Sequence, residues 1–233
     1  MPILKASLHL HTKEDPEDGK IIKYSAKDLI DQASQLDFQV LAITLHNRLY
    51  WNPELEHYAQ ERNIILLPGI EVSLKKNPWS QAHVLIIGAK SLPPIRTIDD
   101  LEKWRHDHPE CLVIAPHPNF PVQSLGLKIL PEKLNLFDAW EHSWFYTRIF
   151  NLNKPTIKLA QQFKKPLIST SDLHRHRFLK DDYCLIDCEK ADQASIITAI
   201  KQGRLKNISR PKGILELVFY TLRFIRPRKG KKL

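Results

Sequence analysis

The sequence predicts an α/β fold in which a largely parallel sheet closes, or nearly closes, on itself as a barrel. The first observation is that short apolar runs rich in β-branched residues alternate with amphipathic segments of helical period along the 233 residues. The second is that this alternation of strand and helix recurs about seven times, which is typical of (β/α) barrels. The third is that histidine and carboxylate residues follow the ends of several of these runs.

Each expected strand is a short apolar run bounded by polar or turn residues. In chain order the expected strands are Ile3–Leu8, Val40–Thr44, Ile64–Ser73, His83–Gly88, Leu112–Ala115, Phe137–Glu141, Leu167–Ser171 and Cys184–Ile186. None of these runs approaches the roughly 20 apolar residues that a helix needs to cross a bilayer, so the sequence argues against a membrane span. The hydrophobic content of 42% argues equally against a disordered chain.

Capping residues mark three of the expected helices. Ser25 is expected to cap one helix, with Asp28 three residues later completing a capping box. Asn153 opens a second helix, with Pro155 in its first turn, and Asp192 is expected to cap a third.

The net charge of +9 is confined to the end of the chain. The sequence has 35 Lys and Arg against 26 Asp and Glu, a difference of nine. From Arg204 onward ten basic residues face one acid, Glu216, so this segment alone accounts for the charge and residues 1–203 are neutral overall. We therefore expect one compact domain over residues 1–210 and an apolar, then basic tail over residues 211–233, with any attraction to polyanions local to that tail.

A cytoplasmic location is expected from the first residues and from the cysteines. Residues 1–6 show no charged segment followed by an apolar run and a cleavage site, so no secretory signal is visible. Cys111, Cys184 and Cys188 have no metal-ligand spacing and are interpreted as reduced thiols.

Metal-binding residue types gather at the ends of the expected strands. His9 and His11 alternate at the end of the first run, so both rings face the same side of a strand. The residues that follow later runs are His46, Glu71, His117, Asp172 and His174. In a barrel of parallel strands the carboxyl ends meet at one face, where several imidazoles and carboxylates together would bind divalent transition metals.

Each of these patterns alone is weak evidence for a metal. A single His-x-His is common, and His57, His106 and His108 are interpreted as solvent-facing residues on helices. The repetition at successive strand ends is far more specific, because chance rarely produces such convergence.

Six segments resemble, in order, the motifs of the polymerase-and-histidinol-phosphatase (PHP) family. They are His9-Leu10-His11-Thr12, Asp18-Gly19, Ile43-Thr44-Leu45-His46, Gly69-Ile70-Glu71-Val72-Ser73, Ala115-Pro116-His117-Pro118 and Ser171-Asp172-Leu173-His174. The resemblance implies a distorted seven-stranded TIM-like barrel, two or three divalent ions such as Mn, Fe or Zn, and hydrolysis of phosphate esters.

The resemblance also implies which residues hold the ions. The first ion would take His9, His11, Glu71 and Asp172; the second would take Glu71 as a bridge, His83 and His117; the third would take Asp18, His46 and His174. Asp18 is preferred as the acid of the first loop because it precedes a glycine, with Asp15 and Glu17 as competitors.

The sequence departs from the family pattern in two places. Ser7 and Leu45 stand where the family often has Asp, which predicts weaker carboxylate support for the metal-binding imidazoles. Between His117 and Asp172 there is also too little chain for a large inserted cap over the site.

The expected mechanism is attack by a metal-activated water on a phosphate ester, with no covalent nucleophile. Asp172 and His142 are the expected catalytic residues, the first as a metal ligand and the second as a proton donor to the leaving oxygen. Arg48 and Arg175, each close in sequence to a metal-binding histidine, are the expected phosphate contacts.

The leading function is therefore hydrolysis of a phosphomonoester, either a small metabolite or a nucleotide. The alternatives are exonuclease or phosphodiesterase action on nucleic-acid ends, a non-catalytic metal-binding regulatory module, and hydrolysis of C–N bonds on a similar barrel.

Three interpretations of the tail over residues 211–233 stay open. It is a helix packed on the barrel, an amphipathic element on the anionic inner face of a membrane, or a guide for nucleic acid.

Overall fold

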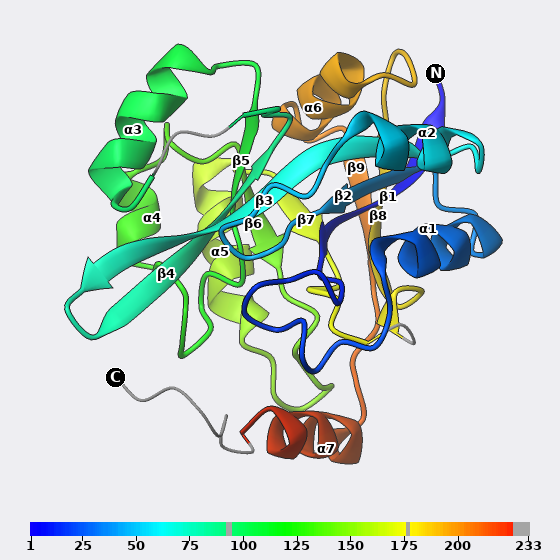
Figure 1. Ribbon diagram of the computed structural model, residues 1–233. Helices are drawn as coiled ribbons and strands as arrows, with labels where there is room; N and C mark the ends of the chain where they lie inside the picture. The colour runs from blue at the N-terminus through cyan, green and yellow to red at the C-terminus, as the bar shows by residue number, and fades with distance from the viewer. Residues whose placement is uncertain (92–94, 176–177, 226–233) are drawn as a thin grey trace.

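The computed structural model describes residues 1–91, 95–175 and 178–225 of the chain. One mixed sheet forms its centre, and helices cover the outside of that sheet (Figure 1). The strands are β1 (Ile3–Leu10), β2 (Val40–Ile43), β3 (Ile65–Asn77), β4 (Ser80–Ile87), β5 (Leu112–Ala115), β6 (Ala139–His142), β7 (Leu167–Ser169), β8 (Asp182–Asp187) and β9 (Leu205–Ser209). The helices are α1 (Ala26–Gln35), α2 (Pro53–Gln60), α3 (Ile98–Asp107), α4 (Ile129–Glu132), α5 (Asn153–Phe163), α6 (Gln193–Lys201) and α7 (Ile214–Ile225).

The α/β barrel class is confirmed, but the expected number of strands is wrong. The described residues form a nine-stranded sheet in the order β7-β6-β5-β4-β3-β2-β1-β8-β9, rather than seven strands. The pairs β3–β4, β4–β5, β1–β8 and β8–β9 are antiparallel, so the sheet is mixed rather than largely parallel. β9 escaped the sequence analysis because its residues, Leu205 to Ser209, are polar and only half buried, without a long apolar run.

A side chain joins the two edges of the sheet. The amide of Asn207 on β9 donates to the carbonyl of Leu167 at 2.9 Å, and its Oδ1 accepts from the backbone N–H of Ser169 at 2.7 Å. These bonds satisfy backbone groups of the edge strand β7 that a ladder would otherwise satisfy. The sheet is therefore nearly closed, and the last step around the barrel is made by one asparagine.

All three helices begin where the sequence analysis expected, and two of the three starts carry a side-chain cap. Ser25 and Asp28 form a reciprocal capping box on α1, and Asp192 accepts from Ser195 N at the start of α6. α5 begins at Asn153, but this side chain does not cap the helix. It accepts from Ser143 N and donates to Ser143 O instead, which ties the start of α5 to the loop after β6.

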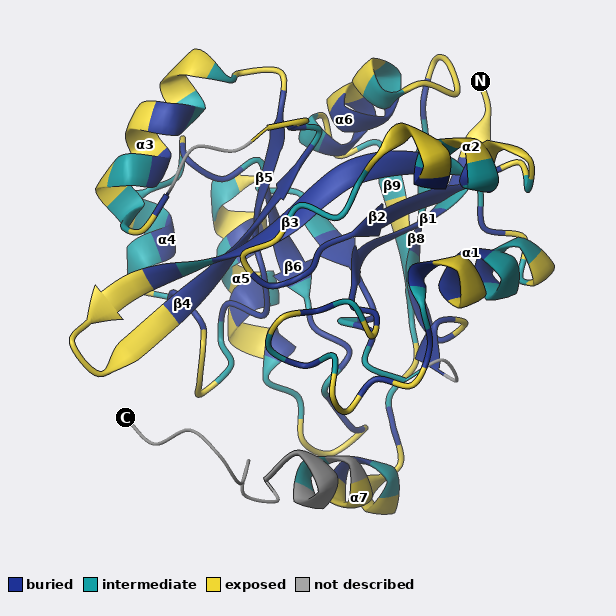
Figure 2. Cartoon of the chain, in the orientation of Figure 1, coloured by how far each residue is buried: buried dark blue, intermediate teal, exposed yellow. Residues whose placement is uncertain are grey.

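The inside of the barrel is apolar at the end where the parallel strands begin. Leu4, Ala6 and Leu8 on β1 pack with inward residues of the other strands, and α6 contributes Ile196 and Ile200 to the same cluster. Two further clusters lie between the sheet and the outer helices, one under α1 and α2 and one under α3, α4 and α5. Figure 2 shows the strands as the most buried part of the chain and the tip of the β3–β4 hairpin as exposed.

The C-terminal segment packs against the barrel at the opposite end from α6 (Figure 1). Leu217 of α7 is 6% exposed and belongs to the same cluster as Trp144 and Phe178. The division into residues 1–210 and 211–233 stays a prediction. No helix in the described part of the chain is long and apolar enough to span a bilayer.

Candidate metal centre

His9, on β1, and His11, just after its end, reach the inside of the barrel because the strand is irregular. The pairing register of β1 on β2 shifts between Ser7 and Leu10. Ala6, before this shift, and Leu8, within it, pack in the apolar interior, whereas Leu10, after it, packs under the outer helices. A shift of one residue exchanges the faces of a strand, so His9 and His11 turn inward and are fully buried.

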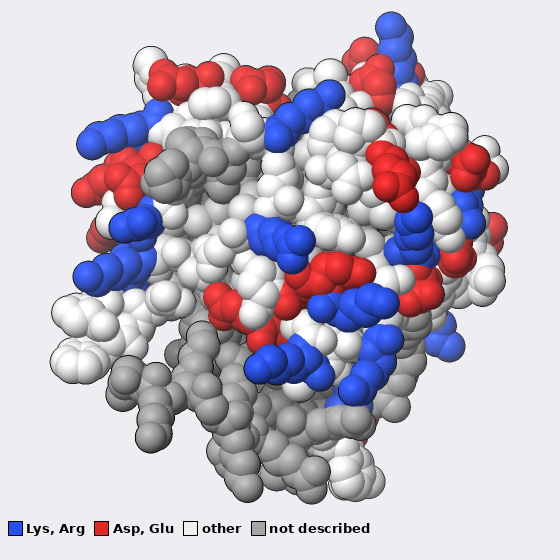
Figure 3. Space-filling view, in the orientation of Figure 1, with Lys and Arg blue, Asp and Glu red and all other residues white. Residues whose placement is uncertain are grey.

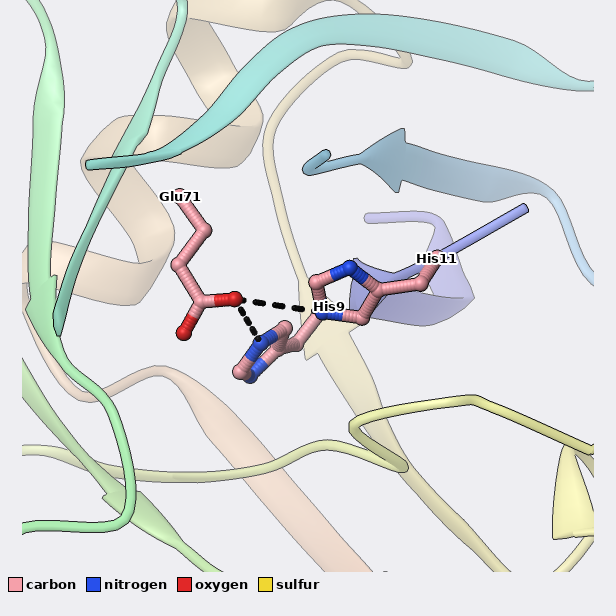
Figure 4. A group of neighbouring side chains, drawn as sticks. All are labelled: His9, His11 and Glu71. Atoms are coloured by element: carbon pink, nitrogen blue, oxygen red, sulfur yellow. Dashed lines mark ion pairs between the residues drawn. The ribbon is translucent and has the colours of Figure 1, made fainter. Parts of the chain in front are cut away.

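The carboxylate of Glu71 lies at the centre of the site. Figure 4 shows the rings of His9 and His11 directed at this group. Glu71 Oε2 is 3.2 Å from the Nε2 atoms of both His9 and His11, and 3.3 Å from His46 Nε2. Glu71 Oε1 is 2.8 Å from His83 Nδ1 and 3.6 Å from His117 Nε2. The two oxygens of one buried carboxylate therefore face two different groups of histidines.

His83 joins this centre because β4 runs antiparallel to β3. It lies near the start of its strand, which in a purely parallel barrel would be the wrong end. In the hairpin, however, His83 pairs with Ser73, two residues after Glu71. The start of β4 therefore lies beside the end of the buried part of β3, and the antiparallel pairing accounts for the position that the resemblance implied.

Two candidate ligands lie on strained backbone at strand ends. His117 follows β5 with φ of 29°, and Asp172 follows β7 with φ of 40°. Residues with a side chain rarely adopt positive φ, and such strain is often found at functional sites. Asp172 Oδ1 is 3.5 Å from the Nε2 atoms of both His9 and His11. The strained turn thus brings this carboxylate to His9 and His11.

The third expected group also comes together in part. His174 Nε2 lies 3.0 Å from Asp18 Oδ2, and His174 Nδ1 lies 3.4 Å from Asp172 Oδ1. His46, the remaining member of this group, contacts Glu71 instead, with 3.3 Å between its Nε2 and Glu71 Oε2. Its ring stacks on that of His11 at 4.6 Å between centroids. The structure thus brings together all nine residues expected to bind metal, namely His9, His11, Asp18, His46, Glu71, His83, His117, Asp172 and His174.

The competitors of Asp18 have other positions. Asp15 is buried, and its carboxylate accepts from the ring nitrogens Nδ1 of His11 at 2.8 Å and of His46 at 3.0 Å. It also accepts from the backbone N–H of His46. Glu17 lies at the surface, where it accepts from the Asn47 amide at 3.2 Å. Asp15 therefore holds two imidazoles in position, while Asp18 faces His174.

The expectation of weak carboxylate support for the imidazoles is wrong. Asp15 orients His11 and His46, and buried Glu141 on β6 accepts from His9 Nδ1 at 2.8 Å. Glu141 also accepts from the backbone N–H of His117 and from the Thr170 hydroxyl. Such partners fix the ring orientation and leave the other nitrogen free for a metal. They are supplied from a loop and another strand instead of from the motif positions at Ser7 and Leu45.

The sequence carried a signal for one of these two residues. Glu141 ends an expected strand, so the rule that found His117 and Asp172 applies to it as well. Asp15 is one of four acids in a polar loop, with Glu14, Glu17 and Asp18, and only the folded loop shows that Asp15 contacts the imidazoles of His11 and His46.

The pKa values of the centre show that its buried carboxylates are stabilised in the ionised form by positive charge. Burial opposes protonation of His9, but Glu71, Asp172 and Glu141 outweigh burial and raise its pKa to about 10. The pKa values of His11, His46 and His117 are also raised against burial by neighbouring carboxylates. Conversely, burial would raise the pKa values of Glu71 and Asp172, but the adjacent imidazoles hold both well below their usual range. The carboxylates therefore remain ionised and attract either protons on the histidines or metal ions.

Buried ring nitrogens of four histidines favour metal ions over protons as the cations that these carboxylates attract. The Nε2 atoms of His9, His11 and His83 and Nδ1 of His117 are buried and make no hydrogen bond, although His9 and His11 Nε2 lie 3.2 Å from Glu71 Oε2. Buried polar atoms usually have a hydrogen-bond partner, so four such nitrogens on histidines around one carboxylate need an explanation. Groups such as His9, His11 and Glu71, or His46, Glu71 and His83, have ligand atoms within 4.8 Å of one another. Nitrogen and oxygen donors at this spacing suit Zn²⁺, Mn²⁺ or Fe²⁺.

A cavity of about 450 Å³ opens above the centre. Its polar floor consists of Asp18, His46, Glu71, His83, His117, Asp172 and His174. Its walls include the aromatic rings of Phe120, Trp144 and Phe145, together with Thr221 of α7. On the face seen in Figure 3, Lys and Arg side chains surround a group of acidic side chains near the middle. The cavity has the size and mixed polarity of a site for a small ligand.

The remaining expected site residues lie outside the described lining of this cavity. His142 follows Glu141 on β6 and points to the other side, where its ring packs on Tyr146 at 5.3 Å. Arg48 is exposed and donates to the carbonyl of Glu14 at 3.1 Å. Arg175 is half buried next to His174. Proton donation by His142 and phosphate binding by Arg48 and Arg175 therefore stay predictions, and the geometry favours the metal cluster over these three residues.

Comparison with solved structures places the chain in a known class of fold. A two-domain protein from Bacteroides vulgatus, described as containing a predicted PHP-like metal-dependent phosphoesterase, aligns at a TM-score of 0.69 and 13% identity, over 95% of this chain and 70% of its own. PsfC from Pseudomonas syringae aligns at 0.63 and 14% identity over 97% and 100%. An amidohydrolase from Chromobacterium violaceum with bound sulfate aligns at 0.60 and 13% identity over 91% and 99%.

The likeness to the Bacteroides vulgatus protein confirms the resemblance to PHP proteins at the level of the fold. The identities of 13–14% are too low to transfer an activity. No family model and no curated protein matches the sequence.

Proposed function

We propose that this protein is a metal-dependent phosphoesterase that hydrolyses a phosphomonoester, either a small metabolite or a nucleotide. The observation that carries the proposal is the position of Glu71. One of its oxygens faces His9, His11 and His46, and the other faces His83 and His117. A carboxylate placed in this way could hold two adjacent divalent ions, and a pair of such ions would supply the charge neutralisation and activated water that in-line displacement at phosphorus needs.

The protein's own residues prepare this centre for chemistry. Asp15 and Glu141 lock the rings of His9, His11 and His46. The strained backbone at Asp172 fixes a carboxylate beside two of those rings. Divalent ions held there would lower the pKa of a bound water and neutralise the phosphoryl oxygens.

The cavity favours a compact substrate. Its volume of about 450 Å³ lies within the usual range for small-molecule sites, roughly 300–1,000 Å³. The charged floor would receive the phosphate, and the rings of Phe120, Trp144 and Phe145 would contact an apolar or aromatic remainder.

A specific feature supports phosphodiester cleavage as the second candidate. A groove of about 780 Å³ adjoins the cavity, and the two share Val122 and Gln123 in their linings. Lys75, Lys76 and Arg96 line this groove, and none of its described lining residues is acidic. The phosphate backbone of a nucleic-acid strand that extends from the metal centre would meet positively charged side chains in this groove.

The test is metal reconstitution followed by a substrate panel. Protein treated with a chelator is supplied with Mn²⁺, Zn²⁺ or Fe²⁺ and assayed on an aryl phosphate monoester, an aryl phosphate diester and a cyclic amide. We expect the monoester to be turned over fastest. Faster turnover of the diester would favour phosphodiester cleavage, and faster turnover of the amide would indicate C–N bond hydrolysis. Inactivity with every metal would refute an enzymatic role.

A pair of variants separates the site from general effects of substitution. Glu71→Gln keeps the shape of the side chain but removes the charge that would bridge two ions. Glu132→Gln makes the same change at an exposed position at the end of α4. We expect the first variant to lose activity and bound metal and the second to keep both.

A further inference from the structure

The C-terminal helix α7 exposes an apolar face that the barrel leaves uncovered. Ile214 is 57% exposed, Leu215 72%, Val218 45% and Phe219 66%. Their spacing of one and three residues places them along one side of a helix. Large aliphatic and aromatic side chains grouped in this way usually mark an interaction surface.

A neighbouring face of the same helix is fixed to the protein. Leu217 is buried in the cluster that contains Trp144 and Phe178, and Thr221, one turn later, lines the cavity above the candidate metal centre. Because the inward face is held in this way, the outward face has a defined direction.

The start of α7 is anchored by a buried ion pair. The side chain of Lys212 is fully buried and contacts the carboxylate of Asp182 on β8, which is also buried. The backbone N–H of Lys212 donates to the carbonyl of Tyr146 at 2.8 Å, and Arg210 makes two hydrogen bonds to Asp181. A buried charge left without its partner is costly, so this pair holds the segment in one position.

A second exposed apolar segment is linked to this anchor. In the loop between β6 and α5, Ile149 is 81% exposed and Phe150 is 55% exposed. The same loop contains Tyr146, whose carbonyl accepts from Lys212 and whose hydroxyl bonds to Ser209. The loop and α7 therefore approach each other through the residues that precede the helix.

The sequence from α7 onward is strongly cationic. After Glu216 it contains no acidic residue, and its basic residues are Arg223, Arg226, Arg228, Lys229, Lys231 and Lys232. An apolar helix face followed by clustered cations is the pattern of segments that bind the surface of an anionic bilayer.

We propose that α7 docks the protein on an anionic lipid bilayer. Ile214, Leu215, Val218 and Phe219 would enter the boundary between headgroups and acyl chains, and the net positive charge of the sequence after Glu216 would add electrostatic attraction to anionic lipid. Nucleic acid would gain from the cations but little from aliphatic side chains. A second copy of the chain would bring two cationic segments together, because a twofold interface pairs like with like.

This docking would place the candidate metal centre beside the membrane. Thr221 belongs both to α7 and to the wall of the cavity, so the helix that contacts lipid also bounds the entrance to the site. Docking itself does not depend on the proposed phosphoesterase activity and is measured without it.

The test is sedimentation of the full chain with vesicles of phosphatidylcholine alone and of phosphatidylcholine mixed with phosphatidylglycerol. We expect binding to the mixed vesicles, weaker binding as salt increases, and little binding to phosphatidylcholine alone. Leu215→Glu combined with Phe219→Glu should lower the partition coefficient by at least about tenfold, through lost apolar burial and added repulsion.

The matched control is Trp79→Glu, at the turn between β3 and β4. Trp79 is 94% exposed, so this substitution replaces a large exposed apolar side chain with a carboxylate without touching α7. We expect it to leave vesicle binding unchanged. Both variants change exposed side chains, and thermal unfolding verifies that they fold.

Three outcomes would overturn the proposal. The first is failure of the wild-type chain to bind the mixed vesicles. The second is binding of the double variant at the wild-type level. The third is occupation of α7 by another partner. The last case would appear as a dimer in light scattering that the double variant dissociates, or as tight binding to a single-stranded RNA oligomer that competes with vesicles and survives the double variant.

Discussion

The two ends of the barrel are formed by the same strands and have opposite properties. At the end near α6, inward side chains such as Leu4, Ala6 and Ile186 pack with Ile200 into an apolar plug. At the other end, His9 on β1, Glu71 on β3 and His117 after β5 are buried imidazole and carboxylate side chains. The plugged end buries apolar surface, whereas the metal-binding end concentrates charge and strained backbone. Stability and function are therefore separated along the barrel axis, and substitutions at the two ends should have different effects.

The largest expected effect is loss of catalysis at the metal-binding end. His9→Ala and Asp172→Ala each remove a side chain that faces the same group of donors. We expect each to lower phosphoester turnover by at least about a thousandfold and to lose metal, because the ions supply several kcal/mol of transition-state stabilisation. Turnover on an aryl phosphate and elemental analysis measure the two effects. Unaltered metal content in both variants would remove these residues from the site.

The reverse result is expected at the plugged end. Ile200→Ala leaves a cavity at a fully buried position, which costs about 2–5 kcal/mol of unfolding free energy. Denaturant unfolding measures this loss. Metal content per folded molecule should remain that of the wild type, and a parallel loss of metal would show that the two ends are coupled.

A smaller effect is expected for the residues that orient the ligands. Asp15→Asn removes the charge that holds His11 and His46 but keeps the shape of the side chain. We expect metal affinity to fall by about 10–100-fold with the fold intact. Competition against a metal-binding dye measures the affinity. An equal affinity for both proteins would mean that the imidazoles need no such support.

The pH dependence of metal binding tests whether the metal-binding end of the barrel holds protonated imidazoles when no metal is bound. In the protein without metal, the carboxylates raise the pKa of His9 to about 10, so at neutral pH this ring carries a proton. A metal binds only the neutral imidazole, so binding must release the proton. As the pH falls, metal affinity should therefore weaken by up to about tenfold per pH unit for each proton displaced. Calorimetry of Mn²⁺ binding in buffers of different ionisation heat counts these protons. Binding without proton release would contradict the raised pKa.

The sequence was informative where local pattern determines position. His46, His117 and Asp172 follow apolar strands, and strand ends of a barrel converge whatever the details of the sheet. Glu71 lies within the long strand β3, in the register that turns it inward.

The parts that escaped prediction depend on pairing and on loop conformation. The hairpin that brings His83 to the site requires the antiparallel register of β3 and β4, which no apolar run encodes. β9 is polar, and its role in closing the barrel is carried by the side chain of Asn207. The choice of Asp15 as the residue that orients two imidazoles depends on how one acidic loop folds. Tertiary contacts decide each of these cases.

The most direct test of the account is anomalous diffraction from crystals of the protein loaded with Mn²⁺. The central claim is that the carboxylate of Glu71 bridges two adjacent metal sites. The account predicts one anomalous peak beside Glu71 Oε2, near His9 and His11, and another beside Oε1, near His83 and His117. The absence of any peak at this carboxylate, or a single peak bound to only one of its oxygens, would contradict it.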